Sequence, residues 1–122
     1  MSRITAYVTH IVKHESAASI EESAFRDLTS LASVDLSQAR SLRSIQPEAF
    51  KGCSSLESID IPQNVESIGH SAFHRCSSLT LFTLPQHVTK IESLSFDGCT
   101  SPNSITLHEG VTSIGKKSFQ RL

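Results

Sequence analysis

Short stretches of the chain alternate between apolar and polar residues, and each is preceded by a stretch with a different spacing. In residues 56–61, which read LESIDI, two isoleucines alternate with Ser58 and Asp60. This period of two predicts a short β-strand with one buried face. Residues 68–73, IGHSAF, instead combine a glycine, small polar residues and Ala-Phe with the spacing of a single helical or 3-10 turn. The pattern therefore predicts units in which a short turn and a short strand alternate.

The same pattern returns along most of the chain at a nearly fixed interval. Residues 49–62, AFKGCSSLESIDIP, recur with few changes as residues 72–85, AFHRCSSLTLFTLP. A phenylalanine marks each copy, at intervals of 25, 23, 23 and 23 residues: Phe25, Phe50, Phe73, Phe96 and Phe119. A single coil of this kind cannot bury its apolar edge alone, but it buries that edge against a neighbour about 4.8 Å away. The repeat therefore predicts a parallel solenoid.

The repeat also divides the chain into two parts. Residues 20–122 are interpreted as a solenoid of four full repeats and a truncated fifth. Residues 1–19 fit the pattern weakly and are interpreted as a degenerate N-terminal repeat or cap. The last unit stops at Leu122, after its phenylalanine and before its strand. We therefore expect an open apolar edge at the C-terminal end, which is a template for association with another copy.

Three cysteines occupy one column of the predicted stack. The column reads Leu28, Cys53, Cys76, Cys99 and Leu122. Since the position accepts leucine at both ends, we expect a buried apolar slot in which cysteine acts as a small hydrophobe. A parallel column points its side chains the same way, which disfavours disulfides, and the spacing matches no zinc site. The cysteines are predicted to be structural, and the phenylalanine column is predicted to be a stacked aromatic spine.

The full repeat resembles that of a known family. It reads Ile-Gly-x-x-Ala-Phe-x-x-Cys-x-x-Leu-x-x-Ile-x-Ile-Pro, nearly complete in residues 68–85 and, with Gln46 in place of glycine, in residues 45–62. This is similar to the BspA-like, or Treponema pallidum type, leucine-rich repeat, and the similarity covers residues 20–122. The resemblance implies a leucine-rich-repeat solenoid of the α/β class. Its 23-residue coils would place parallel strands on the concave face and short helical or 3-10 turns on the convex face.

The resemblance also carries an expectation about function. Members of that family are known mostly as surface proteins of bacteria and protozoan parasites, where some bind host matrix proteins or other cells. None is recognised by a catalytic motif. The resemblance therefore implies a non-catalytic protein interaction module that adheres to host or cell-surface proteins, and host matrix proteins are among the partners it implies. The alternatives are an intracellular scaffold or host-directed interaction protein, and a self-assembling solenoid, a homo-oligomer, that uses its C-terminal edge.

Charge and hydropathy narrow the range of partners. The formal net charge is -1, with acidic and basic residues interspersed, so no basic stripe is available for phosphates and we expect no nucleic-acid partner. No stretch approaches the roughly 20 apolar residues of a membrane span, and residues 1–19 lack the pattern of a signal peptide. We expect a protein partner and no membrane insertion. The localisation stays open, although the resemblance implies the cell surface or secretion.

The outward positions of the predicted strands form the candidate binding face. Their side chains are short and polar apart from Leu81, which is therefore the expected contact anchor. Asp35 and Asp60, on adjacent strands, are placed to accept hydrogen bonds from arginine or lysine of a partner. A merely solvated sheet face is the alternative interpretation. The residues of the candidate face are Ser33, Asp35, Ser58, Asp60, Leu81, Thr83, Ser104 and Thr106.

Two sets of side chains suggest other chemistry but lack the rest of a site. His70 and His74 are four residues apart, as are His10 and His14, which is a spacing found in metal sites on helices. They lack the glutamate of the metalloprotease motif and an evident third ligand, so exposed histidines are the favoured interpretation. The two aspartates of the candidate face suit a general acid and base pair or a calcium site. Because the chain has no nucleophile motif or phosphate loop, we expect no enzyme activity, no cofactor and no metal.

Overall fold

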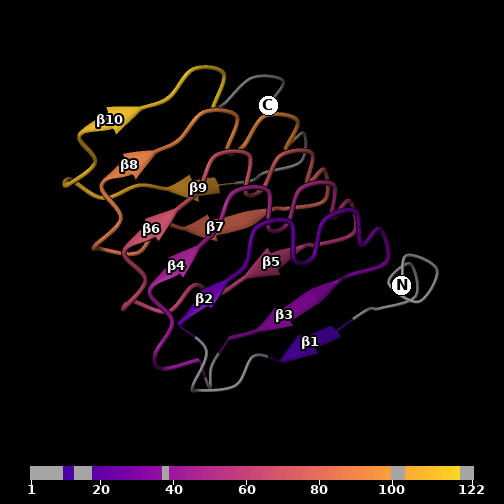
Figure 1. Ribbon diagram of the computed structural model, residues 1–122. Coiled ribbons are helices and arrows are strands. Elements are labelled where there is room, and N and C mark those ends of the chain that lie inside the picture. The colour runs from indigo at the N-terminus through magenta and orange to yellow at the C-terminus, as the bar shows by residue number, and fades with distance from the viewer. Residues whose placement is uncertain (1–9, 13–17, 37–38, 100–103, 119–122) are drawn as a thin grey trace.

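Short β-strands form the regular structure of the protein (Figure 1). The computed structural model describes residues 10–12, 18–36, 39–99 and 104–118. These ranges contain no helix, and hence none that could cross a bilayer. The strands are β1 (His10–Val12), β2 (Ser19–Ile20), β3 (Ser33–Asp35), β4 (Ser44–Ile45), β5 (Ser58–Ile59), β6 (Ser67–Ile68), β7 (Leu81–Thr83), β8 (Lys90–Ile91), β9 (Ser104–Thr106) and β10 (Ser113–Ile114).

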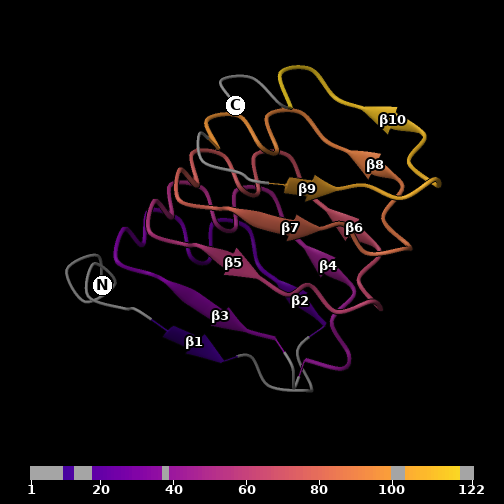
Figure 2. The same cartoon turned by 180° about the vertical axis from the view of Figure 1, so that it is seen from behind.

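The strands form two walls of parallel sheet. The odd-numbered strands join in the order β1-β3-β5-β7-β9, and the even-numbered strands form the sheets β2-β4-β6 and β8-β10. Figures 1 and 2 show the odd-numbered strands along one side of the molecule and the even-numbered strands along the other. Each strand pairs with the equivalent strand of the next coil, so that Ser33 lies opposite Ser58 and Ser44 lies opposite Ser67. This register confirms a parallel solenoid with one coil for each repeat.

The even-numbered strands were not predicted from the sequence. The pattern placed the isoleucine of IGHSAF in a turn, whereas the structure places it at the end of β6 (Ser67–Ile68). That isoleucine, Ile68, is 5% exposed and points into the core, and the residue before it is exposed. The second wall of the coil therefore also has one face toward the interior and one toward solvent.

The third side of each coil consists of hydrogen-bonded turns, where helical or 3-10 turns were expected. Lys51 donates its backbone N–H to the carbonyl of Glu48, three residues earlier, whereas Phe50 donates to the carbonyl of Ala72 in the next coil. The same alternation runs through residues 48–53. In a continuous helix, every backbone N–H would bond to a carbonyl within the same coil. Here alternate N–H groups bond to the next coil instead, so this side forms turns that are joined to the neighbouring coils and no helix. This corrects the expectation of helical turns for the described residues.

Alternate turns on this side have a residue in the left-handed region at their third position. In the turns formed by residues 46–49 and 69–72, the third residues are Glu48, with φ 61°, and Ser71, with φ 58°. In the turn formed by residues 50–53, the third residue is Gly52, with φ 80°. A positive φ at this position is the mark of a type II turn. Glycine adopts it without steric cost, and the other residue types here are held in it by the bonds to the neighbouring coils.

Apolar side chains from all three sides fill the interior. Phe50, Phe73 and Phe96 are at most 1% exposed. The Phe73 ring stacks on those of Phe50 and Phe96 at centroid distances of 5.5 and 5.9 Å and interplanar angles of 7° and 5°. Phe82, from the odd-numbered sheet, meets the Phe73 ring at 64° and 5.1 Å. The aromatic spine is therefore confirmed for the described coils, and it connects the turn side to the opposite wall.

The cysteine column is buried, as predicted. Cys53, Cys76 and Cys99 are free thiols with 0% exposure. Each donates a hydrogen bond to a carbonyl of the preceding coil, and the bond from Cys76 Sγ to the Phe50 carbonyl is 3.2 Å long. Burial raises the pKa of Cys53 and Cys99 to about 12 and the pKa of Cys76 well above its usual value. The thiols therefore remain protonated donors that link successive coils, which is a structural role.

Candidate partner-binding face

The predicted site residues lie on the outward face of the odd-numbered sheet, which we call the strand face. They belong to β3, β5, β7 and β9 or directly follow β5. Ser33 and Asp35 are half-buried, and Ser104 lies in β9 opposite Leu81, although its side chain is outside the described part. The exposed members are Ser58, Asp60, Leu81, Thr83 and Thr106.

Alternation along the strands holds these side chains outward. The residues between them, Val34, Ile59 and Phe82, are at most 7% exposed and point into the core. Because the side chains of a strand alternate between its two faces, burying this inner row fixes the outer row toward solvent. The register then stacks the outer side chains of neighbouring coils in two rows.

Two shallow depressions lie side by side on the strand face and share Asp60. The first, of about 250 Å³, lies between β5 and β7 and is lined by Ser58, Leu81 and Thr83. The second, of about 330 Å³, lies on the β3 side and includes Asp35. Both are open to solvent, so they suit side chains of a protein partner better than an enclosed small molecule.

Leu81 is the large apolar side chain of the strand face. It is 56% exposed, and the residues that pair with it on the neighbouring strands are Ser58 and Ser104. Inward-pointing Phe82 anchors the same strand in the core, so Leu81 is held at the surface by its own strand. An exposed leucine beside small polar residues has the form of a contact anchor.

The structure describes no metal centre among the candidate residues. In the ranges it describes, no group of three or more His, Cys, Asp or Glu side chains is arranged to hold an ion. His70 is exposed, as expected, but His74 is 7% exposed, which corrects the expectation that both histidines are exposed. The side chain of His10 and the whole of His14 lie outside the described residues.

His74 is buried against an acidic residue of the next coil, a pair that the sequence analysis missed. Its Nε2 lies 2.8 Å from Oδ2 of Asp97, which is 2% exposed, although the contact is not aligned as a hydrogen bond. Burial lowers the pKa of His74, and the positive charges of Lys51 and Arg75 lower it further, against the opposing effect of Asp97. The residues that follow successive phenylalanines form one column, which reads Lys51, His74 and Asp97. This column places His74 and Asp97 on adjacent coils and is the signal by which the sequence could have revealed the pair.

Stability is expected to fall as the pH drops below the ordinary pKa of histidine. The unfolded chain then binds a proton at His74, near pH 6.5, that the folded chain takes up only at lower pH, so acid favours unfolding. The slope attributable to this group is at most about 1.4 kcal/mol per pH unit. Guanidinium unfolding between about pH 7.5 and 5.5 measures it in the wild type and in His74→Gln. A matched variant at exposed His70, His70→Gln, should retain the wild-type slope, and equal slopes for all three proteins would contradict the prediction.

Comparison with known proteins agrees with this architecture. A family model described as a BspA type leucine-rich repeat region, in six copies, matches residues 4–122. A search of curated proteins gave no match.

Three solved structures of relatives illustrate the same arrangement. A leucine-rich cell surface protein from Faecalibacterium prausnitzii A2-165 superposes with a TM-score of 0.85 at 31% identity over 93% of this chain. A leucine-rich repeat protein from Bacteroides ovatus ATCC 8483 gives 0.72 at 28% identity over 94%, and the Treponema pallidum leucine-rich repeat protein gives 0.65 at 27% over 90%. The chain spans 30%, 35% and 61% of these three proteins, respectively.

Proposed function

The chain belongs to the BspA-type leucine-rich repeat family, and from this premise we propose that it adheres to host or cell-surface proteins through the strand face. Repeats of this family form protein-interaction modules, which makes a protein the class of partner for this chain. Adhesion, and the residues that carry it, are the content of the proposal. The alternative of an intracellular scaffold would use the same face on a different partner.

The observation that carries the proposal is the form of the strand face. It combines an exposed leucine with two depressions that share the exposed carboxylate of Asp60. The surrounding side chains are short, so a partner can approach the strand backbone closely. The Faecalibacterium prausnitzii relative is described as a cell surface protein, which supports a surface role, although the chain spans only 30% of it.

The proposal is tested by binding to immobilised fibronectin and fibrinogen. We expect saturable binding by the wild type and its loss in a variant with Ser58→Arg, Asp60→Arg and Thr83→Arg, because three long cations fill both depressions and reverse the charge. These three positions are exposed, so the variant should fold, which circular dichroism checks.

A matched control places the same substitutions on the opposite side of the coil. Glu66→Arg, Ser67→Arg and Thr89→Arg change one acidic residue, one serine and one threonine, all of them exposed and near β6 and β8. The control variant should bind as the wild type does. Equal losses in the two variants would remove the strand face as the site, and no binding by the wild type would exclude adhesion to these two matrix proteins.

A second candidate function, self-association through the C-terminal edge, is favoured by one column of the core. Four isoleucines that begin successive coils are at most 5% exposed, whereas the fifth, Ile114, is 57% exposed. It lies in β10, which pairs with β8 and has no further strand on its other side in the described part of the chain. An exposed core residue beside an unpaired strand suits the addition of another coil.

Self-association predicts a mass that rises with protein concentration. Light scattering after gel filtration should show this for the wild type, and Ile114→Lys should abolish it, since a charge on the edge opposes stacking. Leu81→Lys, which places the same charge on an exposed apolar residue of the strand face, is the control and should leave the mass unchanged. A wild type that stays monomeric at all concentrations would rule out this candidate.

A further inference from the structure

We propose that the strand face binds an extended segment of a partner protein that presents an apolar side chain to Leu81 and, two residues away, a lysine or arginine to Asp60. Leu81 and Asp60 line the same depression, between β5 and β7. The inference rests on the proposed function and adds to it the chemistry of the partner.

Charge is divided unevenly between the sides of the coil. The segments that contain β3, β5, β7 and β9 include acidic residues and neither lysine nor arginine. These segments are residues 32–36, 57–63, 80–86 and 104–109, and their acidic residues are Asp35, Glu57, Asp60 and Glu109.

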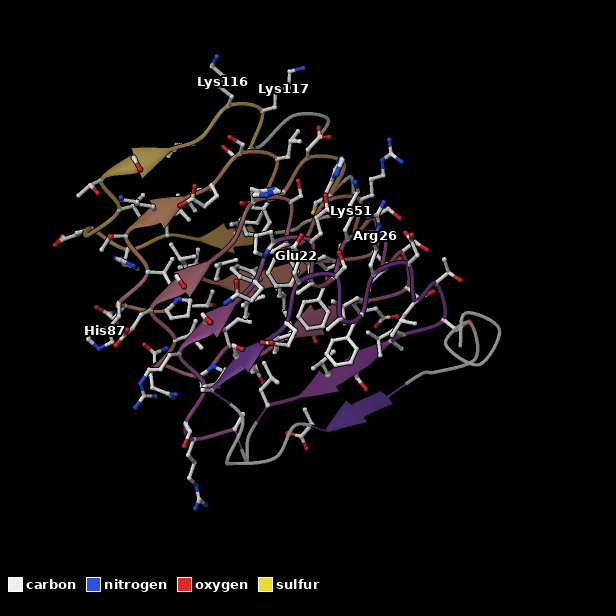
Figure 3. The ribbon with its side chains drawn as sticks, viewed as in Figure 1. Glu22, Arg26, Lys51, His87, Lys116 and Lys117 are labelled. Atoms are coloured by element: carbon white, nitrogen blue, oxygen red, sulfur yellow. The ribbon has the colours of Figure 1, made fainter. Side chains whose placement is uncertain are left out.

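The basic residues of the described ranges lie on the turns, before the even-numbered strands or within them. Figure 3 shows Arg26 and Lys51 on the turns, and Lys116 and Lys117 on the coil that follows β10. The complete set in these ranges is Arg26, Arg40, Arg43, Lys51, Arg75, Lys90, Lys116 and Lys117. In a chain with a net charge of only -1, the Asp, Glu, Lys and Arg residues of these four segments are therefore all acidic, which favours a cationic partner segment over an acidic one.

The carboxylate of Asp60 differs in its surroundings from an acidic residue on the turn side. Glu48 is paired with Arg26 at 2.8 Å and with Lys51 at 3.7 Å. The side chain of Asp60 is exposed and, within the described part of the chain, forms no hydrogen bond or ion pair. A cation from a partner would give this carboxylate a neighbour of opposite charge, so the contact adds an interaction without breaking one.

The spacing of Leu81 and Asp60 matches that of an extended peptide. Ser58 lies opposite Leu81 in the register, and Asp60 is two residues beyond Ser58, so Leu81 and Asp60 are diagonal neighbours on adjacent strands. With strands about 4.8 Å apart and a rise of about 3.3 Å per residue, such diagonal neighbours are about 8 Å apart. In an extended segment, residues i and i+2 point to the same side and are about 7 Å apart. The pattern apolar-x-basic therefore places both side chains in register with the strand face.

The inference is tested with three heptapeptides titrated to millimolar concentration against the isotope-labelled chain in nuclear magnetic resonance experiments. The first contains Leu-Thr-Arg between polar residues, the second has glutamate in place of arginine, and the third has the order Leu-Arg-Thr, which points the two side chains to opposite faces. We expect the first peptide to shift the signals of Leu81 and Asp60 and to bind about two- to fivefold more tightly than the others, the range of an exposed ion pair.

Substitutions then assign the preference to one carboxylate. Asp60→Asn should bind all three peptides alike, whereas Glu66→Gln, an exposed acidic residue near the opposite sheet, should keep the preference. Equal binding of the three peptides by the wild type, shifts on another side of the coil, no shift at all, or an unchanged preference in Asp60→Asn would each overturn the inference. If the peptides fail while the three strand-face arginines still abolish matrix binding, the proposed function stands and the partner has a different chemistry.

Discussion

Replacing Phe73 by alanine is expected to lower the free energy of unfolding by about 3–5 kcal/mol. Phe73 is 0% exposed, and its ring stacks on those of Phe50 and Phe96 and meets the edge of Phe82. Alanine would leave a cavity bordered by two neighbouring coils and the opposite sheet, which can fill it only by moving together. The loss is a large part of the 5–15 kcal/mol that typically stabilises a domain.

Chemical denaturation measures this loss, with the phenylalanine at the N-terminal end of the spine as control. The chain has no tryptophan, so far-ultraviolet circular dichroism is the signal to follow in guanidinium. Phe25→Ala removes the same atoms from a partly buried ring that stacks on Phe50 at 5.5 Å. We expect less than half the destabilisation seen for Phe73→Ala, and equal losses would show that full burial between two stacked rings does not set the contribution of Phe73.

The fold could be predicted from the sequence because stacking turns each repeat position into a column. Once the phenylalanines are aligned, all residues in the column of Cys53 are expected to share one environment. Leucine in that column indicates that the environment is apolar. The strands β3, β5, β7 and β9 were predicted by the same alignment, since their alternation recurs in each copy. Repetition thus converts a weak local signal into a strong one.

The second wall and the turns could not be predicted in the same way. Each even-numbered strand has two residues, such as Ser67–Ile68 in β6, which is too short to show a period of two. The turns contain apolar residues with helical spacing, but their backbone donors bond to the next coil, as Phe50 does to Ala72. Bonds between coils are a property of the stack, so the local pattern does not contain them.

The sequence predicted which positions form the candidate site. The shape of the site and the distribution of charge around it became visible only in the structure. Register alone places Ser58, Asp60, Leu81 and Thr83 on one face. The depressions that share Asp60, and the separation of acidic and basic sides, depend on how the coils stack. The burial of His74 was missed for a related reason, because solvent is excluded there by Asp97 and the adjacent coils rather than by its own sequence neighbours.

Replacing Gly69 by alanine is expected to destabilise the protein by about 1–3 kcal/mol, the second largest of the effects predicted for stability. A Cβ at this position would lie 2.5 Å from the backbone nitrogen and 2.8 Å from the Cα of Pro47 in the preceding coil. Gly69 also donates its N–H to the carbonyl of Ile45 at 2.8 Å, so the two coils are held together where the extra carbon would enter. Relief of the clash requires a shift of backbone on one of the coils, because no flexible side chain is available to move.

Another glycine provides the matched control for this substitution. A Cβ at Gly110 would meet only ring atoms of His108, at 3.1 Å, and Gly110→Ala should change the free energy of unfolding by less than about 1 kcal/mol. Both variants are compared with the wild type by guanidinium denaturation at one pH. Gln46 and Glu92 occupy the column of Gly69 in the neighbouring coils, so the column itself accepts a side chain. If Gly69→Ala proves as stable as Gly110→Ala, the coil at Gly69 can make room for a side chain as the coils at Gln46 and Glu92 do. Contact with Pro47 would then not fix the distance between the coils.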